Sequence, residues 1–128
     1  MTPAEELRAA ADRLLDRTAD AIHNDRLTWA TGHTLGSRSP VVVDDPEQPS
    51  VLIETYAARL EAVNRYLVLL GPATGLALAH WLSETAVDVA ATEGTGGALH
   101  PEGGTSKAWT AALDVARAVL GQPSGIRP

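Results

Sequence analysis

Three ionisable residues recur at four-residue spacing in the second half of the chain, namely His80, Glu84 and Asp88. On a helix, side chains at i, i+4 and i+8 share one face, so this set could approach one metal ion or one substrate together. The pattern lacks the His-Glu-x-x-His spacing of metalloproteases. It also lacks the paired Glu-x-x-Glu and Glu-x-x-Asp helices of all-helical nucleotide pyrophosphatases. The competing and favoured interpretation is a solvated stripe on an otherwise apolar helix.

A second polar group lies in residues 32–39, which combine glycines and hydroxyls with His33 and Arg38. Loops of this kind can bind phosphate through backbone N–H groups. The segment is not a Walker A loop, because it has no Lys and its glycines have a different spacing. The candidate ligand-binding set is Trp29, His33, Ser37 and Arg38, in which Trp29 would stack on a ligand or a partner. A plain hairpin connection is the competing and favoured interpretation of the loop.

The composition excludes several chemistries. The chain has 128 residues and no cysteine, so disulfides, thiolate zinc sites, iron–sulfur clusters and cysteine nucleophiles are ruled out. A formal net charge of −6 argues against direct nucleic-acid binding, which needs a basic face. No cofactor pattern is present, and we predict no cofactor.

The chain also shows no targeting or membrane pattern. Its first residues are acidic and lack the apolar core of a secretory signal. The longest apolar stretch, residues 66–81, is interrupted and falls short of the roughly 20 apolar residues that a spanning helix needs. We therefore expect a soluble, cytoplasmic protein that does not bind membranes.

The elements that must position these residues are mostly helical. Thr2, Pro3 and Glu5 form a capping box that begins a helix of about residues 3–24. Residues 27–43 contain two short β-branched and aromatic runs separated by a polar loop, which predicts a two-stranded β-ribbon.

Three further helices are predicted over residues 51–70, 73–91 and 107–120. The helix at 51–70 carries an apolar stripe at spacings of four and three residues, formed by Leu52, Tyr56, Leu60, Val63, Leu67 and Leu70. The helix at 73–91 is apolar almost all round, which is typical of a central helix in a bundle. A flexible, glycine-rich loop is expected at 92–106, and a loose tail at 121–128.

The predicted fold is therefore mainly α (α+β) and forms a single domain over residues 1–128. Three to four helices pack around the central helix at 73–91, and the β-ribbon lies between the first and second helices. The narrow apolar stripes and the unpaired ribbon predict a homo-oligomer.

Three blocks of the chain resemble a known group of proteins. They are residues 2–14 (TPAEELRAAADRL), 65–82 (RYLVLLGPATGLALAHWL) and 112–121 (ALDVARAVLG). Together they are similar to the Ead-like accessory proteins of temperate phages and to small actinobacterial and actinophage proteins. The excess of arginine over lysine, nine to one, is typical of a high-GC genome. Residues 27–49 depart from the group, because its Pro-Gly-Pro-Trp segment is absent.

The resemblance implies a phage or prophage accessory protein with no assigned reaction. Our first functional prediction is a non-enzymatic protein that binds and modulates a host protein, for example in counter-defence. A second hypothesis is a small-molecule binder that sequesters a nucleotide signal of antiphage defence, through the ribbon loop near Trp29 and Arg38. A third is a metal-dependent hydrolase that uses His80, Glu84 and Asp88.

Overall fold

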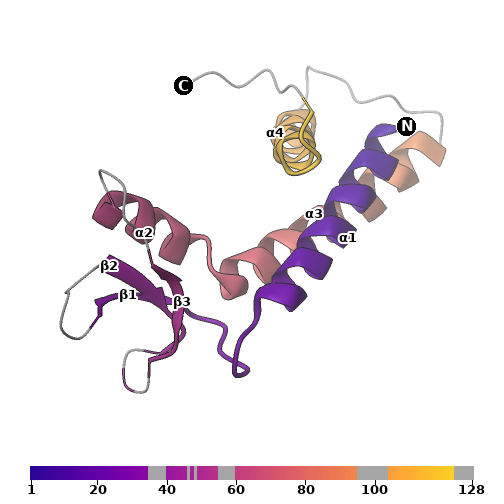
Figure 1. Cartoon of the computed structure of the whole chain (residues 1–128). Helices are drawn as coiled ribbons and strands as arrows, with labels where there is room; N and C mark the ends of the chain where they lie inside the picture. The colour runs from indigo at the N-terminus through magenta and orange to yellow at the C-terminus, as the bar shows by residue number, and fades with distance from the viewer. Residues whose placement is uncertain (35–39, 46, 48, 55–59, 95–103, 123–128) are drawn as a thin grey trace. The chain divides into compact units, whose positions relative to one another are not determined.

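In the computed structural model, the described part of the chain forms four helices and a three-stranded antiparallel sheet (Figure 1). The structure describes residues 1–34, 40–45, 47, 49–54, 60–94 and 104–122. The elements in chain order are α1 (Pro3–Ala21), β1 (Ala30–His33), β2 (Pro40–Val43), β3 (Val51–Glu54), α2 (Leu60–Leu69), α3 (Pro72–Gly94) and α4 (Gly104–Val119). The prediction of a mainly helical protein with a small β element is confirmed.

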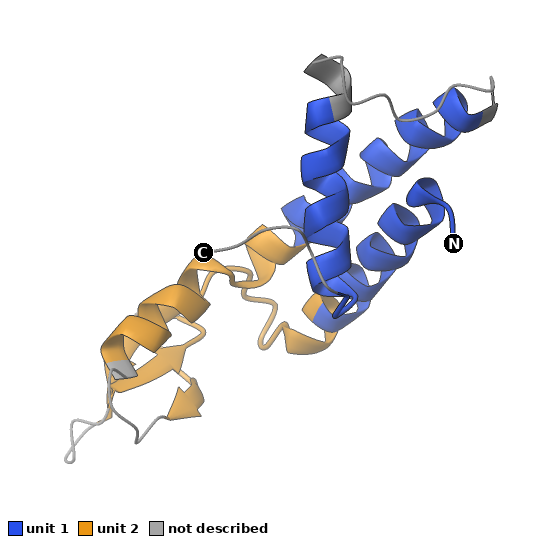
Figure 2. Cartoon of the chain, turned by 90° about the horizontal axis from the view of Figure 1, so that it is seen from above, with its two compact units in different colours: residues 1–17, 76–128 blue, residues 18–75 orange. Residues whose placement is uncertain are grey.

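The chain divides into two compact units, which we describe separately (Figure 2). Unit 1 comprises Met1–Arg17 and Leu76–Pro128, and so holds most of α1 and α3 together with α4. Unit 2 comprises Thr18–Gly75 and holds the sheet, α2, the last residues of α1 and the first of α3. The single-domain organisation stays a prediction.

The start of α1 has the capping box that the sequence predicts. The backbone N–H of Thr2 donates to Oε2 of Glu5 at 2.8 Å, and the backbone N–H of Glu5 donates to the Thr2 hydroxyl at 3.2 Å. This reciprocal pair satisfies donors that a helix leaves without partners at its N-terminus.

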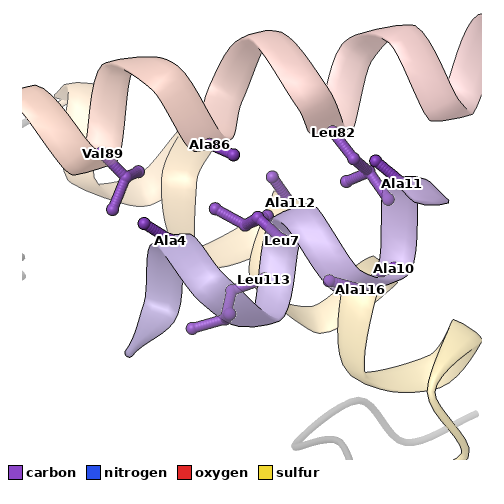
Figure 3. Close-up of a cluster of buried hydrophobic side chains, with 10 residues drawn as sticks. All are labelled: Ala4, Leu7, Ala10, Ala11, Leu82, Ala86, Val89, Ala112, Leu113 and Ala116. Carbon is purple, nitrogen blue, oxygen red and sulfur yellow. The ribbon is translucent and has the colours of Figure 1, made fainter. Parts of the chain in front are cut away.

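Three helices of unit 1 share one hydrophobic core (Figure 3). Leu7 and Leu82 are its largest fully buried aliphatic side chains. The other members of the cluster are Ala4, Ala10 and Ala11 of α1, Ala86 and Val89 of α3, and Ala112, Leu113 and Ala116 of α4. Because most of these residues are alanine, the helices can approach closely, and the two leucines fill much of the space between them.

One side of α3 faces this core. Along α3, Ala79, Leu82, Ala86 and Val89 are buried at spacings of three and four residues, whereas Trp81 and Val87 are 40% and 51% exposed. The nearly all-apolar sequence of α3 therefore does not mean burial on every side. Three helices contribute jointly to the core, and α3 is not an all-round buried centre.

The sheet of unit 2 has the order β1-β2-β3, and all its pairs are antiparallel. Its middle strand, β2, buries Val41, Val42 and Val43 almost completely. Helix α2 packs on β1 and β2. A two-stranded ribbon is only marginally stable in water by itself, and here a third strand and a covering helix stabilise it.

The third strand corrects the sequence prediction. Residues 51–54 were expected to begin the second helix, but they form β3, and α2 begins at Leu60. β3 pairs with β2 at Ile53↔Val42 and, beyond a bulge, at Val51↔Val43. These β-branched residues suit a strand, and pairing with a buried neighbour outweighs the local helical spacing. The structure thus has a three-stranded sheet where the sequence predicted a two-stranded ribbon. The predicted helical residues 55–59 lie outside the described residues.

A buried carboxylate holds the turn that leads into β3. Oδ1 of Asp44 accepts a hydrogen bond from the backbone N–H of Ser50 at 2.8 Å, and its Oδ2 accepts one from the Asn24 amide at 3.1 Å. Ser50 therefore fixes the turn that leads into β3. The Ser50 hydrogen bond, aided by Asn24 and by His23, holds the pKa of Asp44 below its ordinary value of 3.8, although burial opposes this shift.

This lowered pKa predicts a loss of stability in acid. A carboxylate whose pKa is lower in the folded state stabilises the fold above its unfolded pKa, and this contribution is lost as the pH falls through the folded pKa. Removal of the carboxylate in Asp44→Asn should therefore weaken the fall in melting temperature below about pH 4. Thermal melts at a series of pH values measure this slope. The matched control is Asp20→Asn, at an exposed position of α1. An unchanged slope in Asp44→Asn would contradict the prediction.

Candidate functional site

Two features of unit 2 could bind another molecule, and both involve α2. One is a small polar pocket between the sheet and α2, which we call the β1–α2 pocket. The other is a row of exposed apolar side chains on α2, which we call the outer stripe.

The β1–α2 pocket has a volume of about 150 Å³. Its lining comprises Thr31, Gly32 and His33 of β1, Pro40 of β2, and Glu61, Asn64 and Arg65 of α2. Thr31 and His33 are alternate residues of one strand, so their side chains point to the same face of the sheet. The three α2 residues lie within about one helical turn. Strand alternation and helical periodicity thus bring these polar side chains together.

Charged groups line the pocket at its solvent-exposed side. Nε2 of His33 lies 3.5 Å from Oε1 of Glu61, and both side chains are more than half exposed. Arg65 is exposed and forms no ion pair within the described part of the chain, although it lies one turn from Glu61. Asn64 is only 1% exposed and lies on the buried side of α2. The pocket thus combines a cation, an anion and a buried amide.

A larger cavity of about 440 Å³ lies along the sheet and has no lining residue from α2. Its apolar wall includes Val41, Val43 and Val51. A Cβ atom added to Gly32 would lie 3.7 Å from methyl groups of Val41 and Val43, an ordinary van der Waals distance. The missing side chain of Gly32 therefore leaves space beside these two valines.

The outer stripe consists of Val63, Tyr66, Leu69 and Leu70, which are 46%, 61%, 70% and 44% exposed. Spacings of three and four residues make them neighbours on one helical surface. The backbone N–H of Leu70 donates to the carbonyls of Tyr66 and Leu67, so the turn that carries Leu70 is continuous with α2. The helix therefore buries a polar residue, Asn64, and exposes the four bulky apolar side chains of the outer stripe.

The predicted ligand-binding residues do not all lie in this pocket. His33 lines it, whereas Trp29 is half-buried and does not. The indole ring of Trp29 lies against Gly71, where an added Cβ would be 3.7 Å from two ring carbons. Ser37 and Arg38 lie outside the described residues.

The predicted metal-binding residues are exposed along α3. His80 borders a groove of about 250 Å³ with Asp12 and Leu15 of α1, but Glu84 and Asp88 do not line it. Within the described ranges, no group of three or more His, Asp or Glu side chains is arranged to hold a metal ion. The exposure of all three residues agrees with the solvated-stripe interpretation.

Sequence analysis did not single out Glu61, Asn64, Arg65 or Tyr66 as site residues. The available signal was the alternation of polar residues (Glu61, Asn64 and Arg65) with apolar ones along this helix. That signal shows that one side of the helix differs from the other. It does not show which side faces the sheet, because this depends on packing between segments that are distant in the sequence.

Among the described residues, no single helix is long and apolar enough to cross a membrane; α2 and α3 reach the required length and composition only when taken together as a broken pair. Comparison of the chain with protein-family models, with curated proteins and with solved structures finds no match.

Proposed function

We propose that this chain is a non-enzymatic binding protein that docks a helix of another protein on the outer stripe of α2. The observation that carries the proposal is the exposure of four large apolar side chains on one helical surface. Contiguous apolar patches of this kind mark interaction sites on soluble proteins, because covering them removes apolar surface from water. Anchors at i, i+3 and i+7, such as Val63, Tyr66 and Leu70, are the usual means by which one amphipathic helix recognises an apolar surface.

Charge favours a basic partner helix over a second copy of the chain. Each copy carries a formal charge of −6, so two copies repel each other, whereas a basic helix is attracted. The partner we infer is thus an amphipathic helix with an apolar stripe and flanking Lys or Arg residues. The homo-oligomer stays a prediction, which the experiment below distinguishes from the proposal.

The sequence resemblance points in the same direction. The resemblance to Ead-like accessory proteins of temperate phages implies an accessory protein with no assigned reaction, which is compatible with a protein that acts by binding. We therefore propose that the partner is a host protein whose activity the chain modulates in the cytoplasm. The nucleotide-sequestering and metal-dependent alternatives have no comparable surface in the described residues.

Substitution of the outer stripe should weaken helix binding. We expect Tyr66→Ser and Leu69→Ser each to reduce the affinity for a basic amphipathic helical peptide by about tenfold or more, because each change removes a large apolar anchor. Fluorescence anisotropy with a labelled synthetic peptide measures this loss. The same peptide with acidic flanks should bind more weakly, and the difference should shrink in high salt.

Val87→Ser is the matched control, since Val87 is 51% exposed on α3 and lies outside the stripe. It should leave peptide affinity unchanged. Sedimentation of the wild-type chain and of Tyr66→Ser tests whether a second copy of the chain, instead of a partner helix, covers the outer stripe. A dimer that dissociates in Tyr66→Ser would assign the stripe to a second copy and would contradict the proposal.

A further inference from the structure

We propose that the β1–α2 pocket binds a small zwitterion, a molecule of free amino-acid size that carries one carboxylate and one ammonium group. This site is separate from the proposed docking surface, because no residue of the outer stripe lines the pocket. The inference rests on the size of the pocket and on the charges around it.

The volume sets the size of the ligand. A cavity of about 150 Å³ is comparable to an engineered protein cavity that holds benzene, a molecule of six non-hydrogen atoms. Glycine, alanine and serine are of this size. A nucleotide has several times as many atoms, and pockets for ligands of drug size usually have volumes of about 300–1,000 Å³. The β1–α2 pocket is therefore too small to enclose the nucleotide signal considered from the sequence.

The charges set the chemistry of the ligand. Arg65 carries a permanent positive charge and five N–H donors, which suit a carboxylate. Glu61 lies one helical turn before it on the same lining, and its carboxylate can accept hydrogen bonds from an ammonium group. A simple anion would face the negative charge of Glu61, and a simple cation would face Arg65. A zwitterion can pair its carboxylate with Arg65 and its ammonium group with Glu61, so that no two like charges face each other.

The remaining lining residues supply neutral polar groups. Thr31, and Asn64 at 1% exposure, both line the same space. His33 lies 3.5 Å from Glu61 and borders the pocket from the strand side. A small polar molecule thus meets hydrogen-bonding groups from both the helix and the strand.

Two-dimensional amide NMR of the full chain tests the proposal with glycine, L-alanine and L-serine as probes, each at about 10 mM, well above a millimolar Kd. We expect saturable shifts confined to residues around the pocket. Acetate and methylammonium, which each carry one of the two charges, should bind at least about tenfold more weakly. No saturable shift with any of the three amino acids would overturn the proposal. Equal binding of acetate would also overturn it, in favour of a plain anion site.

Isosteric variants test the two charges separately. Arg65→Gln and Glu61→Gln should each weaken amino-acid binding by about tenfold or more, since each removes one charge-assisted interaction. Both positions are exposed, so the fold should persist, and the NMR spectrum reports this directly. Arg17→Gln and Glu84→Gln are matched controls at exposed helical positions outside the pocket. Unchanged affinity in both pocket variants would overturn the proposal, even if the wild-type chain binds an amino acid.

Discussion

Leu82→Ala is expected to lower the free energy of unfolding by about 2–5 kcal/mol, the usual cost of removing a fully buried leucine side chain. Leu82 is 0% exposed and belongs to the core that α1, α3 and α4 share (Figure 3). Much of this core is alanine, whose side chain has no rotamers with which to fill a new cavity. The cavity should therefore persist, which places the expected loss toward the upper part of this range.

Urea denaturation of the full chain, followed by circular dichroism, measures this effect. Val87→Ala is the matched control, because Val87 lies on the same helix and is 51% exposed. Its effect should remain within about 0.5 kcal/mol, as for most surface substitutions. If Leu82→Ala were equally mild, Leu82 would not occupy a close-packed core, and the arrangement of unit 1 described above would be wrong.

Gly75→Ala is expected to destabilise the chain by about 1–3 kcal/mol, the usual cost of overpacking. Gly75 lies in the first turn of α3, and the three atoms that a Cβ there would meet most closely all belong to the side chain of Thr18, near the end of α1. A Cβ atom on Gly75 would overlap the Thr18 hydroxyl and lie 3.1 Å from its methyl group. Thr18 is 8% exposed and has little room to move. The clash should outweigh the gain of about 0.5–1 kcal/mol that alanine normally brings to a helix.

A double-mutant cycle tests this explanation. Thr18→Ala removes the hydroxyl and the methyl group, so Gly75→Ala should cost clearly less in the Thr18→Ala background, with a coupling of about 0.5 kcal/mol or more. Gly32→Ala makes the same chemical change where the nearest atoms are 3.7 Å away, and it should be neutral or stabilising. Additive effects of Thr18→Ala and Gly75→Ala would show that the close approach of these residues is not the cause.

The two proposed binding features lie on different sides of α2, and this separates their tests. Glu61 and Arg65 line the β1–α2 pocket, whereas Tyr66 and Leu69 belong to the outer stripe. Substitutions of Glu61 or Arg65 should therefore weaken amino-acid binding more than helix binding, and substitutions of Tyr66 or Leu69 should do the reverse.

Local features of the fold were predictable from the sequence. The capping box of Thr2 and Glu5, and the start of α3 at Pro72 after the end of α2, depend on residues within a few positions of each other. Their physical causes, which are hydrogen bonds to free N–H groups and the fixed backbone of proline, act within one turn of chain. Part of the candidate site was predictable for the same reason, since His33 was identified as a polar residue of the ribbon.

The rest was decided by tertiary structure. Residues 51–54 have a spacing that suits a helix, but the buried strand β2 beside them supplies hydrogen-bond partners and an apolar surface, and they form β3. Likewise, the sequence shows that α2 mixes polar and apolar residues, but only packing on the sheet places Asn64 inside and Tyr66 outside. A β-strand forms only when a neighbouring strand supplies its backbone hydrogen-bond partners. Which face of a helix is buried depends on the element that packs against it. Composition, charge and the start of α1 were thus determined by the sequence alone, whereas the third strand, the start of α2, the pocket and the outer stripe depend on contacts between distant segments.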